Sequence, residues 1–490
     1  MSINKYMKPI VFSMVLVLTL AACGPKSQPT SEPTQAVVAP SEIPTSAPTA
    51  VPTQAPPVPT EALPAETHPA STVGVTELKI LWADWEPAYL LQKMGNMYEQ
   101  ETGVKVTVDM PGWADFYNDL TTDMAAKSDA WDMVMGESEW LGQAVTSGWF
   151  VDLTDFLASS SLKDSVTPAT LTYYGEYPAG SGKYWAFPTE SDATAWAYRK
   201  DLFENPDEQA AFQAKYGYDL AVPETYSQFK NIAEFFTRTD QNLYGAAIFT
   251  SQDYNGLTLG FQNTLFPWGG DWKDANNNVM GIVNSPESIE AVQFYRDLYQ
   301  CCQWPGGGSA FLWETNDAMI SGQAVMAMNY FTFFPPLIDQ YANPDYYDKI
   351  GFFPNPKGPN GSQGTALGGQ AMSIIAYISP ERQDAAKAFI EWFGQEEVQA
   401  KWGEIGGGTS NANVLNSDQF LNARLYNPAF AASMAFVKDF WNIPIYDQLF
   451  AVVQGELVNF VVDGTGTAQE TMDTIATEQE KILKENGYIQ

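Results

Sequence analysis

The sequence predicts an α/β fold divided into two lobes, and three observations support this prediction. Segments with strand character alternate with segments of helical periodicity over roughly 400 residues, from Val75 onward. The first of these segments follow β-α-β order, which implies a parallel sheet. A single hydrophobic core stops growing near ~250–300 residues, so a globular region of this length requires two lobes.

The elements can be assigned in chain order. The first strand is ELKILWADW, and the helix PAYLLQKMGNMYEQETG follows it with Leu90, Met94, Met97 and Tyr98 at helical spacing. A second strand, VKVTVDM, completes the β-α-β unit, and FYNDLTTDMAAKSDAWDMVMGES repeats the order of helix and then strand. Together these segments predict the parallel part of a sheet.

The later elements continue this alternation. KYWAFPTESDATAWAYRKDLF predicts a strand with a polar interruption from Glu190 to Asp192. SPESIEAVQFYRDLYQ and SPERQDAAKAFIEWFGQEEVQAKW predict helices, because each begins with Ser-Pro and carries acidic residues in its first turn.

The N-terminus has the pattern of an export signal. Lys5 and Lys8 precede an apolar run from Ile10 to Ala22, which at about thirteen residues is shorter than the ~20 that a membrane-spanning helix needs. The run ends in LAAC, which resembles a bacterial lipobox with Cys23 as the acylated residue. We therefore expect a lipoprotein signal peptide over 1–22. The alternatives are a fragment of a core helix and a free cysteine.

The segment 23–74 combines this anchor site with a linker rich in Pro, Thr and Ser. Such a composition buries too little apolar surface to offset the entropy of ordering, so we expect an extended spacer between the membrane and the folded body. Two or three acyl chains would anchor the protein stably, with palmitate as the expected lipid. The predicted location is therefore extracytoplasmic and lipid-anchored to the cell membrane. The alternative is a disordered tail without a function.

Charge and residue usage exclude several classes of function. The net charge is −33, and removal of Lys5 and Lys8 with the signal lowers it to about −35, so we expect no nucleic-acid partner. His68, the only histidine, lies in the linker, which excludes Ser-His-Asp catalysis and HExxH zinc sites in the folded part. We expect no cofactor and no metal. The segment DANNNVMG from Asp274 faintly resembles a calcium loop, but we interpret it as a turn between short strands.

Cys301 and Cys302 are the remaining cysteines, and they are adjacent in the sequence. Adjacent thiols cannot connect distant segments, so they do not form a disulfide framework. We interpret them as small packing residues at the end of a helix. The alternative is a vicinal disulfide.

Ten landmarks in order resemble the family-1, sugar-binding extracellular solute-binding proteins of ABC importers, the type that includes maltose-binding protein. Among them are ELKILWADW, WDMVMGESEWLGQAVTSGWFVDLTDFL, GKYWAFPTESDATAWAYRKDLF, WGGDW, MISGQAVMAMNYF and GGGTSNANVLN. The resemblance implies a periplasmic-binding-protein-like fold with a hinge, a carbohydrate ligand, delivery to ABC permease transmembrane subunits, and a monomer. It places one lobe at about 75–190 and 350–405, and the other at about 191–349 and 406–490. By analogy, the chain crosses between lobes near 189–193, 345–350 and 404–408.

Sugar binding requires flat aromatic faces and a few polar groups that hold hydroxyls. The sequence offers both in loops after the predicted strands, and the resemblance implies a ligand-contacting carboxylate at Asp192 and a stacking ring at Tyr330 or Phe331. Where sugar-binding relatives read LGGW, this chain reads LGGQ, so Gln370 replaces an expected ring. The predicted ligand-binding residues are Trp85, Glu86, Trp113, Glu137, Glu139, Trp140, Asp192, Trp268, Asp271, Trp313, Tyr330, Phe331 and Gln370.

Three classes of function are compatible with these residues. The first is a membrane-anchored receptor that captures an oligosaccharide or related polyol without turnover, and this is the function that we predict. The second is a secreted glycoside hydrolase, which would need two carboxyls ~5–10 Å apart across a cleft. Glu137 and Glu139 share one face of an extended strand, which does not place them across a scissile bond. The third is an adhesion or structural module.

Overall fold

The computed structural model describes residues 74–490. The predicted signal peptide, the predicted acylation site Cys23 and the predicted linker up to residue 73 lie outside the described residues. Within residues 74–490, no helix has both the length and the apolar character needed to cross a membrane.

The predicted β-α-β unit is confirmed. Strand β1 (Glu77–Leu81) and strand β2 (Lys105–Asp109) pair in parallel, and helix α1 (Glu86–Thr102) connects them. Helix α1 ends at Gly103, whose φ of 79° lies in the left-handed region that glycine adopts without steric cost. The predicted helix and strand that follow are α2 (Trp113–Ala125) and β3 (Met133–Gly136), and β3 pairs in parallel with β1.

Residues 74–490 contain one nine-stranded mixed sheet with the order β2-β1-β3-β8-β4-β6-β5, in which β7 pairs with β4 and β9 pairs with β8. The remaining strands are β4 (Phe187–Arg199), β5 (Tyr244–Ala247), β6 (Ala324–Tyr330), β7 (Ile350–Phe353), β8 (Thr365–Ile374) and β9 (Val437–Lys438).

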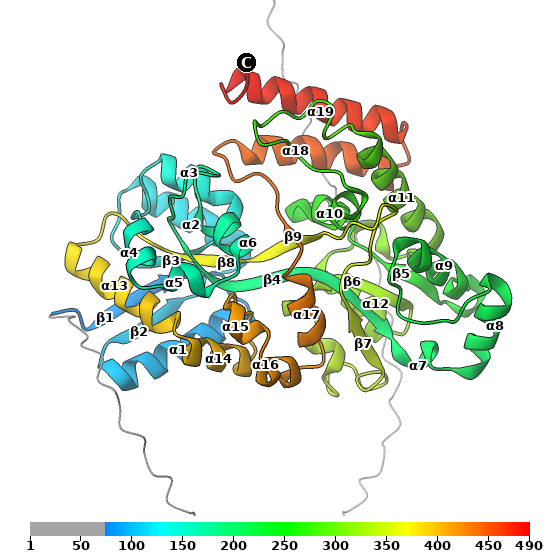
Figure 1. The fold of residues 1–490 in the computed structure, drawn as a ribbon, viewed down its shortest axis with the longest axis horizontal. Helices are drawn as coiled ribbons and strands as arrows, with labels where there is room; N and C mark the ends of the chain where they lie inside the picture. Colours follow the sequence, from blue (N-terminus) through cyan, green and yellow to red (C-terminus); the bar gives the residue numbers. More distant parts are fainter. Residues whose placement is uncertain (1–73) are drawn as a thin grey trace, which may run out of the picture. The chain divides into compact units, whose positions relative to one another are not determined.

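Strand β4 connects the two halves of this sheet. Its first half pairs antiparallel with β8, from Phe187 to Ala193, and its second half pairs with β6 and β7 from Thr194 onward. In Figure 1, β1, β2 and β3 accordingly lie on one side of the molecule, and β5, β6 and β7 lie on the other. The polar residues Glu190 to Asp192 lie at the point where β4 changes partners, which places them between the halves. The predicted lobe boundaries stay a prediction.

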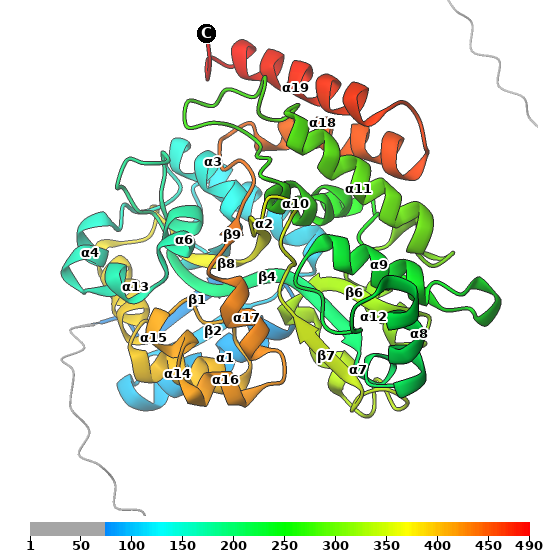
Figure 2. The same cartoon turned by 45° about the vertical axis from the view of Figure 1, so that its right-hand side comes forward.

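Helices cover both halves of the sheet (Figures 1 and 2). After α2 the helices are α3 Leu141–Thr146, α4 Thr154–Ser159, α5 Leu162–Ser165, α6 Pro168–Thr170, α7 Lys200–Phe203, α8 Pro206–Tyr216, α9 Tyr226–Phe236, α10 Gly256–Trp268, α11 Pro286–Cys302 and α12 Leu312–Ile320. They are followed by α13 Pro380–Phe393, α14 Glu396–Ile405, α15 Ala412–Leu415, α16 Asp418–Ala423, α17 Asn427–Ser433, α18 Tyr446–Leu457 and α19 Ala468–Glu485. Helix α19 packs against α11 and α18.

The Ser-Pro helix starts are confirmed. The side chain of Ser285 accepts the N–H of Ser288 at the start of α11, and that of Ser379 accepts the N–H of Arg382 at the start of α13. The second predicted helix is in fact two helices, α13 and α14. The chain turns between them at Gly394, where a side chain would collide with Leu162, and Gln395 is extended.

Two details near α11 differ from the sequence-based interpretation. Cys301 and Cys302 form a disulfide at the end of α11, so the interpretation as two separate packing thiols was wrong, although Cys302 is buried. The segment from Asp274 is a turn, as predicted, because the Asp274 carboxylate accepts the N–H groups of Asn276 and Asn278. However, no strand flanks this turn within the described residues.

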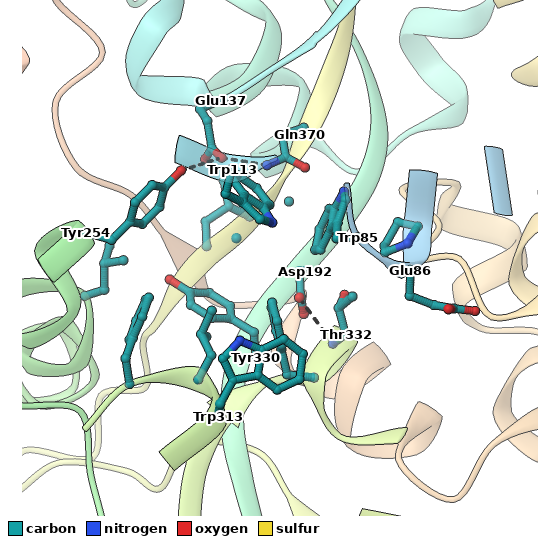
Figure 3. Close-up of a pocket in the computed structure, with 18 of the residues that line it drawn as sticks. Trp85, Glu86, Trp113, Glu137, Asp192, Tyr254, Trp313, Tyr330, Thr332 and Gln370 are labelled. Atoms are coloured by element: carbon teal, nitrogen blue, oxygen red, sulfur yellow. Dashed lines mark hydrogen bonds between the residues drawn. The ribbon is translucent and has the colours of Figure 1, made fainter. Parts of the chain in front are cut away.

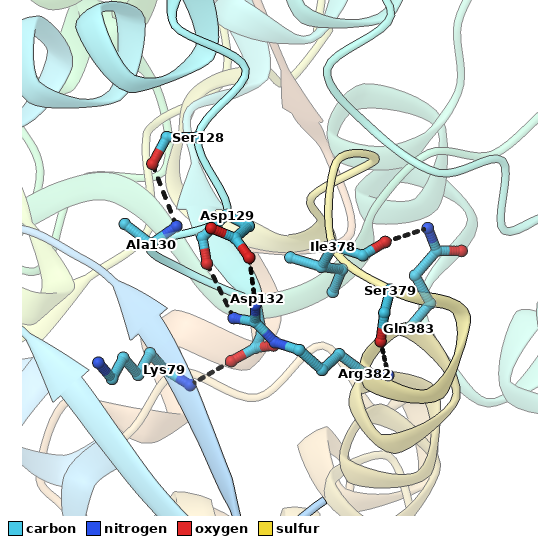
Figure 4. A network of polar contacts seen from close by, with 9 residues as sticks. All are labelled: Lys79, Ser128, Asp129, Ala130, Asp132, Ile378, Ser379, Arg382 and Gln383. Carbon is cyan, nitrogen blue, oxygen red and sulfur yellow. Dashed lines mark hydrogen bonds and ion pairs between the residues drawn. The ribbon is translucent and has the colours of Figure 1, made fainter.

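A network of polar contacts fixes β3, whose end leads to the pocket. The carboxylate of Asp132 is buried and accepts the backbone N–H of Lys79 in β1 at 2.7 Å. Its other oxygen accepts the Nε–H of Arg382 in α13, also at 2.7 Å (Figure 4). The same guanidinium binds the Asp129 carboxylate at 3.2 Å. This network attaches the start of β3 to β1 and α13.

Candidate ligand-binding cleft

A cavity of about 1400 Å³ lies beside the point where β4 changes partners. The segments that follow β1, β2 and β3 form one wall, and residues 251–259, helix α12 and the end of β6 form another. The first half of β8 and the segment after β9 also reach the cavity. The cavity is large enough for a solute of several sugar units.

Ten of the thirteen predicted residues line this cavity. They are Trp85, Glu86, Trp113, Glu137, Glu139, Trp140, Asp192, Trp313, Tyr330 and Gln370. Figure 3 shows Glu137 between Gln370 and Tyr254 in one part of the pocket, and Asp192 beside Thr332 in another.

The other three predicted residues lie elsewhere. Trp268 is buried in the last turn of α10 against Tyr226 and Phe294. The Asp271 carboxylate forms an ion pair with Lys438 at 2.9 Å. The ring of Phe331 is buried against Phe334, Phe430 and Tyr426. The structure thus assigns these side chains to packing and to an ion pair rather than to the cavity wall.

Aromatic rings from both sides meet in the cavity. Trp85 precedes α1 and Trp113 begins α2, and their ring centroids are 5.5 Å apart in an edge-to-face arrangement. From the opposite side, Tyr254 approaches Trp113 at 5.8 Å and Phe333 approaches Trp85 at 6.1 Å. Such faces suit the C–H surfaces of a sugar or polyol.

The remaining lining aromatics differ in exposure. Trp140 is mostly buried, 4.5 Å from the ring of Tyr117 in α2. Tyr330 ends β6 and is also buried, whereas Trp313 in α12 is 59% exposed and lies 5.2 Å from Phe333. Trp313 therefore offers its ring to an incoming solute, while Trp140 supports the wall.

Three carboxyl groups converge at one end of the cavity. Glu137 follows β3, Glu139 lies in the short helix η1 (Ser138–Trp140), and Asp439 follows β9. Burial raises the pKa of Glu137 to about 7 and that of Asp439 to about 6. Burial, with repulsion from Glu137 and Asp439, raises the pKa of Glu139 well above its usual value. Their mutual repulsion indicates that they face a common space.

Gln370 connects this acidic end to the sheet. Its Nε2–H donates to Oε1 of Glu137 at 2.6 Å, and its own Oε1 accepts the indole N–H of Trp82 at 3.1 Å. The residue that replaces an expected ring thus holds Glu137 in place. No group of three or more Cys, His, Asp or Glu side chains within residues 74–490 is arranged to hold a metal ion.

Asp192 organises the opposite end. Its carboxylate is buried and accepts the backbone N–H groups of Phe331 at 2.9 Å and Thr332 at 3.2 Å, which holds the short helix η6 (Phe331–Phe333) against β4. Burial raises the pKa of Asp192 to about 7, although these hydrogen bonds oppose the shift. The neighbouring Glu190 accepts the N–H of Gly408 at 2.9 Å, so β4 also holds the segment after α14.

Several lining residues were not predicted, chiefly Tyr254, Asp439, Phe333 and Tyr446. The sequence around Tyr254 reads DYNG, and the Asn-Gly pair is a turn signal that marks a loop worth considering. Tyr254 has a φ of 51° and Asn255 one of 55°, so two successive left-handed residues direct the ring. Asp439 follows a strand of only two residues, which leaves no periodic pattern.

Known proteins similar to this chain include two binding proteins. An erythritol/L-threitol-binding protein of Mycolicibacterium smegmatis is 24% identical over 321 residues, which span 62% of this chain and 63% of the relative. That match covers less than two-thirds of the relative's length. A protein of Sinorhizobium fredii, described as a probable amino-acid ABC transporter periplasmic-binding protein, is 20% identical over 402 residues, 80% of this chain and 86% of the relative.

Solved structures give the same fold. An ABC transporter solute-binding protein from Agrobacterium radiobacter K84 in complex with ribitol has a TM-score of 0.68 at 22% identity, over 84% of this chain and 99% of that one. Maltose-bound T. maritima MalE3 has a TM-score of 0.68 at 23% identity, over 83% of this chain and 100% of that one. These likenesses confirm the predicted two-lobed α/β fold of periplasmic binding proteins. A family model described as bacterial extracellular solute-binding protein matches residues 93–428, more than half of the chain, and the chain therefore belongs to this family.

Proposed function

We propose that this protein is the extracytoplasmic receptor of an ABC importer, which captures a sugar or polyol and delivers it to the permease. The observation that carries the proposal is the cavity of about 1400 Å³, in which aromatic rings from two sides face a set of fixed polar groups. Ring faces bind the apolar side of a polyhydroxylated solute, and carboxylates and amides bind its hydroxyls.

The named ligands of the relatives support this class of solute. Erythritol or L-threitol, ribitol and maltose occur in three of those names, and all are polyhydroxylated. The name of the Sinorhizobium fredii relative refers to amino acids instead, which are solutes that carry an amine.

The proposal includes attachment to the membrane through Cys23, with the segment 23–74 as a spacer and the protein acting as a monomer. The support is the LAAC sequence after a short apolar run. In cells that express the full chain, Cys23→Ala should move the protein from the membrane fraction to the soluble fraction. A Cys23→Ala protein that stays with the membrane would overturn the anchor.

A thermal-shift and calorimetric screen of the full chain tests the binding function. Erythritol, ribitol and maltose serve as probes, and a bound solute at 100 times its Kd should stabilise the protein by about 2.7 kcal/mol. Trp113→Ala should weaken binding at least ~tenfold because it removes a lining ring. Tyr347→Ala is the control, since Tyr347 is 36% exposed and lies outside the cavity. No stabilisation by any sugar or polyol would contradict the proposal.

A glycoside hydrolase is the second candidate, because the pKa of Glu137 is raised to about 7, which suits a general acid. However, Glu137 and Glu139 both come from the segment after β3, on one side of the cavity, and this favours binding over hydrolysis. Incubation with oligosaccharides distinguishes the two functions. Steady release of new reducing ends would show that the protein is a hydrolase and would overturn the receptor function.

A further inference from the structure

We propose that the solute is a polyhydroxylated amine, such as an amino sugar or an amino alditol, and that its ammonium group binds among Glu137, Glu139 and Asp439. This inference rests on the proposed function, because it assigns a charge to the ligand of the same cavity. The cavity and the family indicate where the solute binds, and the acidic side chains that line the cavity indicate the charge of that solute.

The three carboxyl groups line the same cavity although they come from two distant parts of the chain. Glu137 and Glu139 flank Ser138 after β3, and Asp439 arrives some 300 residues later, after β9. The Ser138 hydroxyl lies 3.4 Å from Oε2 of Glu139 and also lowers the pKa of Asp439 by hydrogen bonding. The segment 137–139 thus carries two of the acidic groups, and the contact of Ser138 with Asp439 places the third on the same part of the cavity wall.

Among residues 74–490, no Lys or Arg forms an ion pair with this group. Within the described residues, no ion pair includes Glu137, Glu139 or Asp439. Lys438, next to Asp439, pairs with Asp271 instead.

The cavity as a whole has the same sign of charge. Its lining contains nine acidic side chains and one basic side chain, Arg424. The Arg424 guanidinium donates to the carbonyl of Ile405 at 3.2 Å. Uncompensated carboxylates in a partly buried wall are costly, and a cationic ligand removes that cost by pairing with them.

Aromatic rings around the carboxyls provide independent support for a cation. Beyond the effect of burial, the pKa of Tyr254 is raised by Glu137 and Glu139, and the pKa of Tyr446 by Tyr117 and Glu139, so both rings lie near the acidic group. The Tyr254 hydroxyl donates to Oε1 of Glu137 at 3.4 Å (Figure 3). Carboxylates combined with ring faces are a typical environment for organic ammonium groups. The rings of Trp85, Trp113 and Trp313 remain available for a hydroxylated chain or ring.

The test compares solutes that differ in one group. Calorimetry on the full chain at pH 7.5 uses 1-amino-1-deoxy-D-glucitol against D-glucitol, and D-glucosamine against D-glucose. We expect the amine to bind at least ~tenfold more tightly in at least one pair. Equal or weaker binding of both amines, with binding of a neutral member, overturns the inference and leaves the proposed function intact. If none of the four solutes binds, the result counts against both the inference and the proposed function.

Two variants test the assigned position. Glu139→Gln and Asp439→Asn should each reduce the amine preference, measured as the ratio of the Kd of the neutral solute to that of the amine, to about twofold or less. Glu234→Gln is the matched control, because it also removes one negative charge but lies on the exposed face of α9, outside the cavity. Circular dichroism shows whether each variant is folded. An amine preference that survives both cavity substitutions overturns the assignment.

Discussion

The hydroxyl of Tyr254 donates a hydrogen bond to Oε1 of Glu137 at 3.4 Å, although 117 positions separate the two residues. Glu137 follows β3 in one half of the sheet, and Tyr254 precedes α10 beside the other half. The ring of Tyr254 also contacts Trp113 at 5.8 Å. Tyr254 therefore contacts both sides of the cavity, and two successive left-handed residues direct its ring across the gap.

Removing this ring should open the cleft. We expect Tyr254→Ala to increase the radius of gyration measured by small-angle scattering, because the two sides lose one of the contacts between them and solute-binding folds close about a hinge. Tyr254→Phe keeps the ring and should change the free energy of solute binding by about 1 kcal/mol or less, since the hydrogen bond is long. Tyr347→Ala should scatter like the unmodified protein. Identical scattering of Tyr254→Ala and the unmodified protein would show that this contact does not hold the cleft.

The carboxyls of the cavity should make the stability of the ligand-free protein depend on pH. The pKa values of Glu137 and Asp192 are raised to about 7 and that of Asp439 to about 6, whereas carboxyls of an unfolded chain titrate near ~4. Their contribution to stability is thus complete below about pH 4 and is lost as the pH rises through 6 to 7. We expect a higher Tm at pH 5 than at pH 8.

The net charge of −33 also disfavours the compact state at high pH, so variants must isolate the cavity. Asp439→Asn should show a smaller loss of Tm between pH 5 and pH 8 than the unmodified protein. Glu234→Gln, with the same change in net charge, should show the full loss. If the two variants lose the same amount of Tm between pH 5 and pH 8, the pH dependence comes from the net charge of the protein rather than from the cavity.

The sequence located those site residues that follow long, regular strands. Trp85, Trp113 and Glu137 were predicted because each comes directly after or near the end of a strand with a clear apolar pattern. Trp268 was assigned to the site because FPWGGDW reads as a loop, but Pro267 and Trp268 lie in the last turn of α10. Its ring consequently packs in the core. The sequence alone does not show whether a ring near the end of a helix points into the core or into the cavity.

Long-range closure explains the residues that were missed. Asp439 reaches the cavity because β9, only two residues long, pairs with β8, and pairing of such distant segments leaves no local signal. Phe331 and Phe333 are two positions apart in a run of aromatics, and tertiary hydrogen bonds fix this segment so that Phe333 lines the pocket: Asp192 accepts the N–H groups of Phe331 and Thr332, and Asn316 donates to the carbonyl of Phe333. Local patterns therefore predict the strand ends, whereas tertiary contacts select the remaining side chains.

Arg382 should be important for stability because it neutralises the buried Asp132. Its guanidinium is 26% exposed, so we expect Arg382→Met to lower the free energy of unfolding by about 3 kcal/mol, the lower end for a broken buried pair. Lys387→Met on the same helix removes an exposed pair with Asp384 and should cost no more than about 0.5 kcal/mol. Urea denaturation measures both values. Similar losses for the two variants would mean that the Asp132 network adds nothing specific.

Gly408 should tolerate no side chain, because β4 and the segment after α14 are in direct contact there. The carbonyl of Gly408 accepts the N–H of Ser191 at 2.8 Å, and its own N–H donates to Glu190 at 2.9 Å. A Cβ atom on Gly408 would lie well inside the van der Waals radius of the Ser191 carbonyl oxygen, which is backbone and cannot rotate away. We expect Gly408→Ala to lower the free energy of unfolding by about 2 kcal/mol or more.

The control for this substitution is Gly455→Ala in α18, where an added Cβ meets nothing within 4 Å. Alanine is the better helix former, so this variant should be neutral or more stable by about 0.5–1 kcal/mol. Urea denaturation of both proteins separates a local collision from a general effect of replacing glycine. If Gly408→Ala unfolds at the same urea concentration as Gly455→Ala, the backbone around Gly408 and Ser191 can shift to accommodate a methyl group at little cost in stability.

Because β4 also holds η6 through Asp192, a shift of β4 at Ser191 would move the part of the cavity that Asp192 lines. Gly408→Ala should therefore weaken solute binding as well as folding, whereas Gly455→Ala should bind normally.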